Sequence, residues 1–595
     1  MHNIYLYQPQ FSVEFHGQKN YWIPYSVGCL WSYLQQYKDI TDNWDLKELG
    51  HKREDQQLIV DRMENPKLCG FSCYVWNERY SLDLAKKVKE KFPECVIAFG
   101  GPQVNASFLE YDFIDTVVYG EGERSFHSIM NLIHNNEPVK QVWEKDRLSD
   151  LDYPSPYTTG VFDQMVIDNP DATWQVTLET NRGCPYACTF CDWGSATYTK
   201  VRRFDVERVR KEIDWIATHN CSYIFCADAN FGIFRDRDIE IANMLRGALE
   251  HPESKLESIN IQFAKNSNET VFEIGRILGD ALKGITFSVQ SMNPDTLEVI
   301  KRKNMKVNKF SELMELGQKY ETSTYTDMIL GMPLETLETW KDGLNELLEV
   351  GQHQAIDIWF TQLLPNSELS QPESREKYGI THVSAENYTN MYNVEDQHAE
   401  IMDLINGTNT MNTEEMVKAY AYGWLITQFH IPGYSQLLAK YARNVMNVPY
   451  RVFYDELWER VKNDDIFSPV LNDLNDTVYH YLKTGKIISD DPSKKGHSLL
   501  HYNSKLIYDN KDRIMELAMK FFDYLPDDII EMQKYYVIGP GQPEQINIRS
   551  SLNIEDWTHT ATNYSIETKI PYDDNFDFWH NRRRGLIKNK ITEAK

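Results

Sequence analysis

The chain has 595 residues, of which 42% are hydrophobic and 13% aromatic, and its formal net charge is −26. The length predicts roughly two to four domains. The composition excludes a disordered chain, and the acidic charge argues against a general nucleic-acid binder, because phosphate backbones are bound by clustered Lys and Arg. No apolar run approaches the ~18 residues of a membrane span, and residues 1–5 lack a signal-peptide pattern. We therefore expect a cytoplasmic protein without membrane contact.

Residues 1–135 alternate between strand and helix patterns. Apolar runs predict strands at 4–7, 68–76, 96–99 and 116–119, and helical spacing appears at 27–34 and 82–92. Repeated strand-turn-helix units indicate an α/β domain with a Rossmann-like, doubly wound parallel sheet. Glycine-rich turns, Gly100-Gly101-Pro102 and Gly120-Glu121-Gly122, follow two of the strands, where a bulky ligand would need close approach to the backbone.

Three further segments follow in the chain. Residues 136–170 are polar and proline-containing, which predicts a linker. Residues 171–370 return to strand-helix alternation, with strands predicted at 174–180, 223–226, 258–263, 284–289, 324–330 and 356–363. Residues 371–595 are predicted to form a mostly α-helical C-terminal domain, with helices that include 386–404 and 413–430, the second capped by Thr413.

The first strand of the central segment runs into Cys184, Cys188 and Cys191, spaced as C-x3-C-x2-C. Cysteine thiolates hold iron-sulfur clusters, and a 4Fe-4S cluster normally takes four of them. Three ligands leave one iron open, where a chelating small molecule could bind. A zinc site with a remote fourth ligand is the alternative that the spacing leaves open. The loop follows a strand, at the edge where parallel α/β proteins place ligands.

This loop resembles that of the radical S-adenosylmethionine (radical SAM) superfamily, both in cysteine spacing and in the aromatic Phe190 before Cys191. The resemblance implies a partial (β/α)6 barrel and SAM chelated by the open iron, with Phe190 near the adenine. It also implies that Asp228 and Asn230 hold the amino group of SAM, and that Ser288 and Gln290 contact its ribose or carboxylate.

Residues 1–135 resemble the cobalamin-binding domain fused to many radical SAM enzymes, because the two glycine-rich turns come in the expected order. The domain lacks Asp-x-His-x-x-Gly, so the resemblance implies cobalamin without a histidine ligand. Trp76 and Asn77, at the end of the second strand, are candidates for the residues beneath the corrin. The other candidate cobalamin-binding residues are Gly100, Gly101, Pro102, Gly120, Glu121 and Gly122. A domain that has lost cobalamin is the alternative.

Together these resemblances imply a cobalamin-dependent radical SAM methyltransferase, which methylates a carbon centre of a small-molecule or peptide substrate through a 5'-deoxyadenosyl radical and methylcobalamin. An electron donor such as flavodoxin or ferredoxin would serve the cluster. The alternatives are a non-methylating rearrangement, oxidation or cyclisation with the same cofactors, and a non-catalytic iron-sulfur redox sensor. Replacing any cluster cysteine by alanine is predicted to abolish radical formation and leave cobalamin binding largely intact. Substrate identity and oligomeric state do not follow from the sequence.

Overall fold

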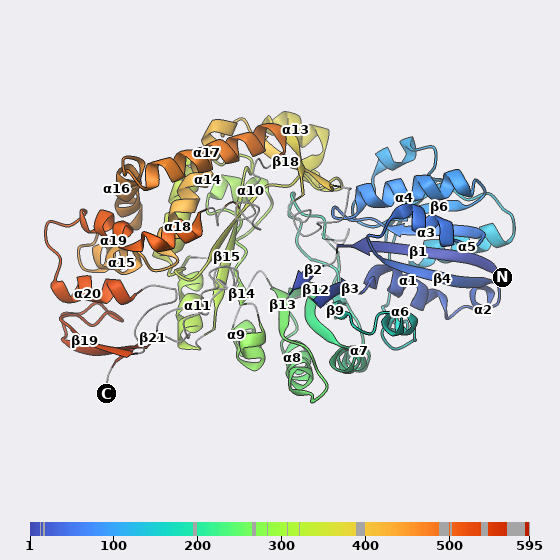
Figure 1. Cartoon of the computed structure of the whole chain (residues 1–595), viewed down its shortest axis with the longest axis horizontal. Helices are drawn as coiled ribbons and strands as arrows, with labels where there is room; N and C mark the ends of the chain where they lie inside the picture. The colour runs from blue at the N-terminus through green and yellow to red at the C-terminus, as the bar shows by residue number, and fades with distance from the viewer. Residues whose placement is uncertain are drawn as a thin grey trace. The chain divides into compact units, whose positions relative to one another are not determined.

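A computed structural model gives the fold of the chain (Figure 1). It describes residues 1–595 with gaps at 12, 16–17, 194–198, 265–268, 283, 306, 321, 388–398, 487–498, 500–502, 537–544, 568–589 and 594–595. The described chain forms two compact units. Unit 1 comprises residues 1–283, 362–377 and 384–404, and unit 2 comprises residues 284–361, 378–383 and 405–595.

A six-stranded sheet forms the N-terminal part of unit 1. Its order is β4-β1-β5-β6-β7-β8, and all neighbouring strands run parallel. The strands are β1 (His2–Gln10), β4 (Trp44–Lys52), β5 (Pro66–Ser72), β6 (Val96–Gly100), β7 (Thr116–Gly120) and β8 (Val142–Asp146). The order reverses between β1 and β5, and doubly wound sheets bind ligands at the carboxyl ends of the strands beside such a reversal.

Helices cover both faces of this sheet, as Figure 1 shows. They are α1 (Tyr25–Leu34), α3 (Gln56–Arg62), α4 (Glu78–Lys91) and α5 (Glu123–His134). On one face Phe71 of β5 shares a buried core with Leu84 of α4. On the other face α5 approaches so closely that a Cβ at Gly70 would lie 2.8 Å from the ring of Phe126. A glycine at this point of β5 therefore allows the helix to pack on the sheet.

The stretch 136–170 is more ordered than the predicted linker. It contributes β8, which pairs in parallel with β7 through Val117 and Val142, and the short helix α6 (Asp163–Ile167). A five-residue edge strand such as β8 gives little periodic signal, because its pattern is short and its pairing with a distant strand is not visible in local sequence.

A second sheet in unit 1 carries the first strands of the central segment. Its order is β13-β12-β9-β3-β2. The pairs β13-β12, β12-β9 and β9-β3 are parallel, and β3 and β2 pair antiparallel. The strands are β2 (Val13–Phe15), β3 (Gln18–Trp22), β9 (Thr173–Leu178), β12 (Cys221–Phe231) and β13 (Ser258–Phe263). The hairpin β2-β3 comes from the N-terminal region, so both sheets belong to one compact unit. The sequence did not predict this crossover.

The helices after β9 and β12 are α7 (Val206–Thr218) and α8 (Arg235–Glu250). The side chain of Asp205 caps α7 by accepting hydrogen bonds from the backbone N–H groups of Glu207 at 2.9 Å and Arg208 at 3.2 Å. Strand followed by helix, repeated with parallel pairing, is the pattern that the sequence predicted for this segment.

The three later strands predicted for the central segment lie in unit 2. They are β14 (Ile285–Thr286), β15 (Thr324–Leu330) and β16 (Ile356–Phe360), and they form a parallel sheet in that order. The strand expected at 284–289 is regular only over two residues, and Gln290, with φ of +68°, forms an isolated parallel bridge with Met328. A helix, α12 (Leu337–Glu349), follows β15 and begins with a capping box between Thr336 and Thr339.

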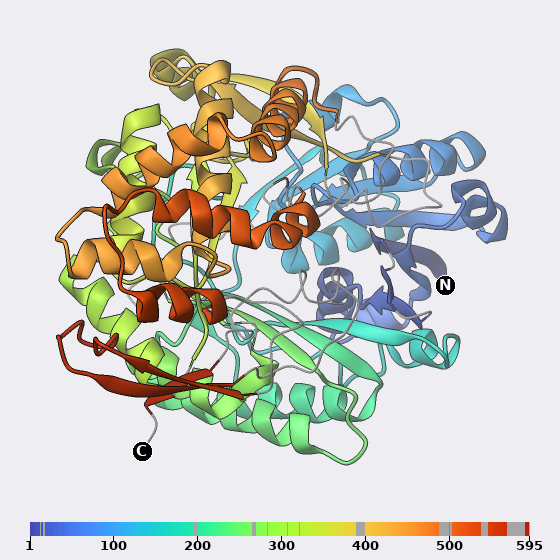
Figure 2. The same ribbon diagram turned by 60° about the vertical axis from the view of Figure 1, so that its left-hand side comes forward.

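The remainder of unit 2 is mainly helical but also contains strands (Figure 2). Its helices include α14 (Thr413–Leu425), α15 (Gln436–Asn444), α16 (Tyr450–Lys462), α17 (Phe467–Thr484), α19 (Lys511–Met519) and α20 (Asp527–Tyr535). Near the C-terminus, β19 (Gln545–Ser550), β20 (Thr562–Glu567) and β21 (Lys590–Glu593) form a small antiparallel sheet. Leu437 of α15, Met532 of α20 and Ile548 of β19 share one buried cluster, which fixes this sheet on the helices.

Two predictions for this region were wrong in detail. The helix expected at 386–404 is replaced at its described ends by β17 (Thr381–Glu386) and β18 (Ile401–Gly407), and residues 388–398 lie outside the described residues. The N-cap of α14 is Asn412 rather than Thr413, because Asn412 and Glu415 form a reciprocal capping box. No helix in the described ranges has the length and apolar character of a membrane span.

Candidate active site

The three cysteines lie in unit 1 on a loop that two short strands close. Cys184 and Cys188 are buried and Cys191 is partly buried. The loop stem is β10 (Asn181–Arg182), paired antiparallel with β11 (Arg202–Arg203). Gly183, with φ of +120°, is required here, because a Cβ would lie 2.5 Å from the carbonyl oxygen of Lys200. The stem therefore holds the first cysteine in a fixed backbone position.

Two hydrogen bonds between Cys184 and Thr199 hold the loop beyond the stem. The N–H of Thr199 donates to the carbonyl oxygen of Cys184 at 2.7 Å, and the N–H of Cys184 donates to Oγ1 of Thr199 at 3.2 Å. In the described part of the chain, no three His, Cys, Asp or Glu side chains form a ready metal site. The fit to a cluster therefore rests on the donor set, three cysteine thiols within one short loop, which suits iron-sulfur chemistry.

Asp228 holds the start of this loop. Its Oδ1 accepts hydrogen bonds from the N–H groups of Thr180 at 2.7 Å and Asn181 at 3.0 Å. Its Oδ2 accepts from Oγ1 of Thr180 at 2.5 Å and Nδ2 of Asn181 at 2.6 Å. Four donors on one fully buried carboxylate make Asp228 a positioning residue for the loop. A direct contact between Asp228 and SAM stays a prediction.

Two further candidate SAM-binding residues, Asn230 and Phe190, lie next to cluster cysteines. Asn230 is 1% exposed, and its Nδ2 donates to Sγ of Cys184 at 3.3 Å. Its Oδ1 has no hydrogen-bond partner among the described residues. Because a buried carbonyl oxygen is costly when unsatisfied, this atom suits a ligand donor such as an ammonium group. Phe190 is partly buried beside Cys191, and its predicted place near adenine remains untested.

Ser288 and Gln290 belong to unit 2. Oγ of Ser288 donates to Oδ2 of Asp327 at 3.2 Å, and the N–H of Gln290 donates to the carbonyl oxygen of Asp327 at 2.9 Å. Gln290 is 6% exposed and adopts the left-handed conformation, which few residues other than glycine and asparagine adopt without strain. Both residues therefore sit on the β15 side of that unit, and their contact with SAM stays a prediction.

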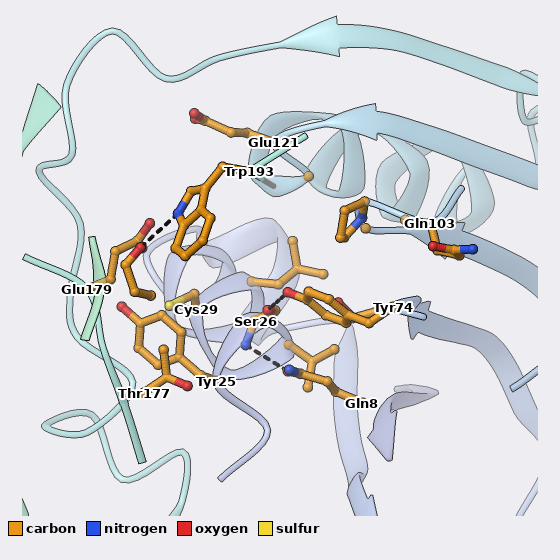
Figure 3. Close-up of a pocket in the computed structure, with 18 of the residues that line it drawn as sticks. Gln8, Tyr25, Ser26, Cys29, Tyr74, Gln103, Glu121, Thr177, Glu179 and Trp193 are labelled. Carbon is orange, nitrogen blue, oxygen red and sulfur yellow. Dashed lines mark hydrogen bonds between the residues drawn. The ribbon is translucent and has the colours of Figure 1, made fainter. Parts of the chain in front are cut away.

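A cavity of about 720 Å³ opens in unit 1 where the strands of its first sheet end (Figure 3). One wall comes from the carboxyl ends of β1, β5, β6 and β7, including Gln8, Ser72, Gly100 and Gly120. The opposite wall comes from the central segment. Its lining residues there are Thr177, Glu179, Asn181, Arg182, Gly183, Asp192, Trp193, Tyr223, Phe225, Ala227, Ala229 and Asn260. The cavity thus lies at the topological switch point and reaches the cysteine loop.

Seven of the eight residues proposed for cobalamin line this cavity. They are Trp76, Gly100, Gly101, Pro102, Gly120, Glu121 and Gly122. Asn77 does not line it. Its amide instead closes the turn after β5, because Oδ1 accepts from the N–H of Tyr74 at 2.8 Å and Nδ2 donates to the carbonyl oxygens of Pro9 and Ser72, each at 3.1 Å. Asn77 is therefore an internal cap of the turn that presents Trp76.

Glycine turns and aromatic side chains form part of the cavity wall. Gly101 has φ of +105°, and a Cβ there would lie 2.6 Å from the carbonyl oxygen of Cys73. Only glycine therefore fits this turn without strain. The ring of Trp76 stacks on Tyr74 with centroids 4.5 Å apart and an interplanar angle of 11°. No histidine is among the described lining residues. The glycine turns therefore allow a bulky cofactor such as a corrin to approach the backbone closely, and its binding without a histidine ligand stays a prediction.

Several lining residues were missed from the sequence. Oγ of Ser26 and the hydroxyl of Tyr74 lie 2.7 Å apart, and the N–H of Ser26 donates to Oε1 of Gln8 at 2.8 Å (Figure 3). Nε1 of Trp193 donates to the carbonyl oxygen of Ala227 at 3.0 Å. Gln8 lies near the carboxyl end of β1 and Tyr74 follows the end of β5, which was a usable signal. Ser26 on α1 gave none, because the approach of α1 to the strand ends is a tertiary feature.

Similarity to known proteins agrees with this geometry. Residues 178–347 match the Radical SAM superfamily, which is the class that the cysteine loop and its parallel strands define. The chain is 35% identical over 477 residues to the cobalamin-dependent radical SAM methyltransferase TokK of Streptomyces tokunonensis, covering 75% of this chain and 69% of that protein.

A second relative is the 2-(S-pantetheinyl)-carbapenam-3-carboxylate methyltransferase of Streptantibioticus cattleyicolor, 34% identical over 462 residues, covering 73% of this chain and 67% of that protein. The fold also resembles the cobalamin-dependent radical SAM enzyme OxsB, solved with aqua-cobalamin and SAM bound, with a TM-score of 0.51 at 15% identity over 90% of this chain and 83% of that one. The chain belongs to the cobalamin-dependent radical SAM methyltransferases. Its cofactors are a 4Fe-4S cluster, SAM and cobalamin.

Proposed function

We propose that this methyltransferase adds a methyl group to a carbon centre of a small molecule, at the cavity in unit 1. When bound, the cofactors supply a 5'-deoxyadenosyl radical and a transferable methyl group, while the protein supplies binding and orientation. One observation carries the proposal. Gly183 and Asp192, the residues just outside the first and last cluster cysteines, line the same cavity as Gly100 and Gly120.

The residues of the chain hold this arrangement in place. Cys184, Cys188 and Cys191 would hold the cluster, and Trp76 with the glycine turns of β6 and β7 would hold cobalamin. Asp228 orients the loop through Thr180 and Asn181. The cavity is largely apolar in its aromatic and glycine lining, which keeps water from a reactive carbon radical.

We further propose a small bicyclic β-lactam that carries a thioether as the substrate class. The support is the 34% identity to an enzyme named for 2-(S-pantetheinyl)-carbapenam-3-carboxylate, and that compound is the first substrate to test. A low-potential electron donor of the flavodoxin or ferredoxin class would reduce the cluster in each turnover.

The test is anaerobic turnover with SAM that carries a trideuterated methyl group. The reconstituted protein, cobalamin, a chemical reductant and the carbapenam are incubated together, and products are quantified by mass spectrometry. The proposal predicts a product that carries the intact trideuteromethyl group, with S-adenosylhomocysteine and 5'-deoxyadenosine both formed. The Cys188→Ala variant is the control without cluster. Consumption of substrate with 5'-deoxyadenosine but without S-adenosylhomocysteine would instead indicate the non-methylating reaction.

A further inference from the structure

One carboxylate in the cavity wall holds both strands of the cluster-loop stem. Glu121 follows the last residue of β7 and lines the cavity. Its Oε2 accepts a hydrogen bond from Nη1 of Arg202 at 3.0 Å, and its Oε1 accepts from Nη2 of the same residue. Nη1 of Arg182 lies 3.6 Å from Oε2 of Glu121. The N–H of Leu148 donates to the same oxygen at 2.9 Å.

The two arginines are direct partners in the stem. Arg182 of β10 and Arg202 of β11 face each other in the antiparallel pair that closes the cysteine loop. Arg182 precedes Cys184 by two residues, and it also pairs with Glu123 at 2.9 Å. Glu121 and Glu123 stand at the end of β7 and the start of α5. The end of β7 and the start of α5 are therefore linked to both stem strands by ion pairs.

These ion pairs are largely shielded from solvent. The side chains of Glu121, Arg182 and Arg202 are 14%, 15% and 12% exposed. Burial alone would raise the pKa of Glu121, but Arg202 and Arg182 lower it overall, so the carboxylate is charged. Removing one partner from a buried ion pair leaves an uncompensated charge, which costs far more than losing an exposed pair. The position of the stem and that of Glu121 in the cavity wall are thus interdependent.

We propose that Glu121 is a positioning residue that couples assembly of the cluster loop to cobalamin binding. An ordered cluster loop fixes Arg182 and Arg202, which in turn fix Glu121 and the cavity wall. Because coupling between two sites is reciprocal, cluster-loaded protein binds cobalamin more tightly, and cobalamin stabilises the cluster loop. The inference rests on the proposed use of both cofactors. It is an alternative to the sequence-based prediction that loss of a cluster cysteine leaves cobalamin binding largely intact, and the titration below distinguishes the two.

The experiment measures the Kd of hydroxocobalamin by anaerobic titration of the full chain, before and after cluster reconstitution. For the unmodified protein we expect Kd to fall at least about fivefold when the cluster is present, the lower end of typical coupling. For Glu121→Gln we expect the two Kd values to agree. Arg202 does not line the cavity, so Arg202→Gln should remove the coupling without removing any contact to the cofactor.

The matched control is Glu48→Gln. Glu48 of β4 also pairs with an arginine through both carboxylate oxygens, Arg62, and lies outside the cavity lining. This variant should keep the coupling. Equal Kd values in the unmodified protein, or an unchanged ratio in Glu121→Gln and Arg202→Gln, would overturn the inference while leaving the proposed methyl transfer intact. Absence of cobalamin binding in every state would instead refute the use of cobalamin itself.

Discussion

The side-chain amide of Asn230 donates a hydrogen bond to Sγ of Cys184, 3.3 Å away, while its own carbonyl oxygen has no partner among the described residues. Hydrogen bonds to cluster sulfurs raise reduction potentials, and partners of this kind orient the ligand. Asn230→Ala should therefore assemble a cluster with a more negative potential and lose activity about 10–100-fold. Redox titration followed by EPR measures the first effect. An unchanged potential would show that the contact has no electronic role.

Asp228 provides the second prediction. In Asp228→Asn the four donors of Thr180 and Asn181 meet a neutral amide whose nitrogen cannot accept, so buried donors stay unsatisfied. We expect a loss of about 1–3 kcal/mol in the free energy of unfolding and a reduced iron content after reconstitution. Asp236→Asn, at an exposed position of α8, is the control and should change stability by less than about 0.5 kcal/mol. Equal stability of the two variants would contradict the positioning role.

The third prediction concerns Trp76 and the affinity for cobalamin. Because its ring stacks on Tyr74 inside the cavity, Trp76→Ala should weaken cobalamin binding about fivefold, with aromatic stacking contributing roughly 1 kcal/mol. Trp76→Phe keeps a flat ring and should retain most of the affinity. Absorbance titration with hydroxocobalamin measures both variants. Full affinity in Trp76→Ala would place the cofactor elsewhere.

Glu78, at the start of α4, gives a pH prediction. Burial is the largest influence on this carboxyl and, with the charge of Glu400, raises its pKa from 4.5 to about 7, against the opposing effects of Gln103 and Arg79. Between these values the folded state binds more protons than the unfolded chain, so the contribution of Glu78 to stability falls as the pH rises from 4.5 to 7.

Glu78→Gln removes this titration. Relative to the unmodified protein, the variant should gain stability between pH 5 and pH 8, by at most about 3 kcal/mol. Denaturant unfolding at both pH values measures the difference. Glu90→Gln, at an exposed position of the same helix, should show no such trend, and a flat profile for both variants would contradict the shift.

Local patterns predicted much of the first sheet and the cysteine loop. The strands at 96–99 and 116–119 and the glycine turns after them need only local signals, namely apolar runs and φ values that favour glycine. Trp76, which lines the cavity, was selected for the same reason, since it lies at the end of a predicted strand. Asn77 was also predicted to contact the corrin, but it does not line the cavity. Which of two adjacent turn residues faces the cavity depends on the hydrogen bonds of the turn, here those of Asn77 to Tyr74 and Pro9.

Long-range pairing explains the rest. The hairpin β2-β3 joins the sheet of β9 although residues 13–22 lie far from it in sequence, and periodicity carries no information on such partners. Glu121 was predicted from its turn as a cofactor contact, but its charge is matched by Arg202, 81 positions later. Residues 401–404 were predicted to be helical yet belong to β18, because β18 pairs with β17 in a two-stranded sheet and this pairing outweighs local preference.

The most direct test of the central claim is a crystal structure of the cluster-loaded protein grown anaerobically with hydroxocobalamin and SAM. The account predicts corrin density in the cavity of unit 1, against Trp76, Gly100 and Gly120, with the cysteine loop at the same cavity. Corrin density outside this cavity, or an empty cavity in protein that is saturated with cobalamin, would contradict it.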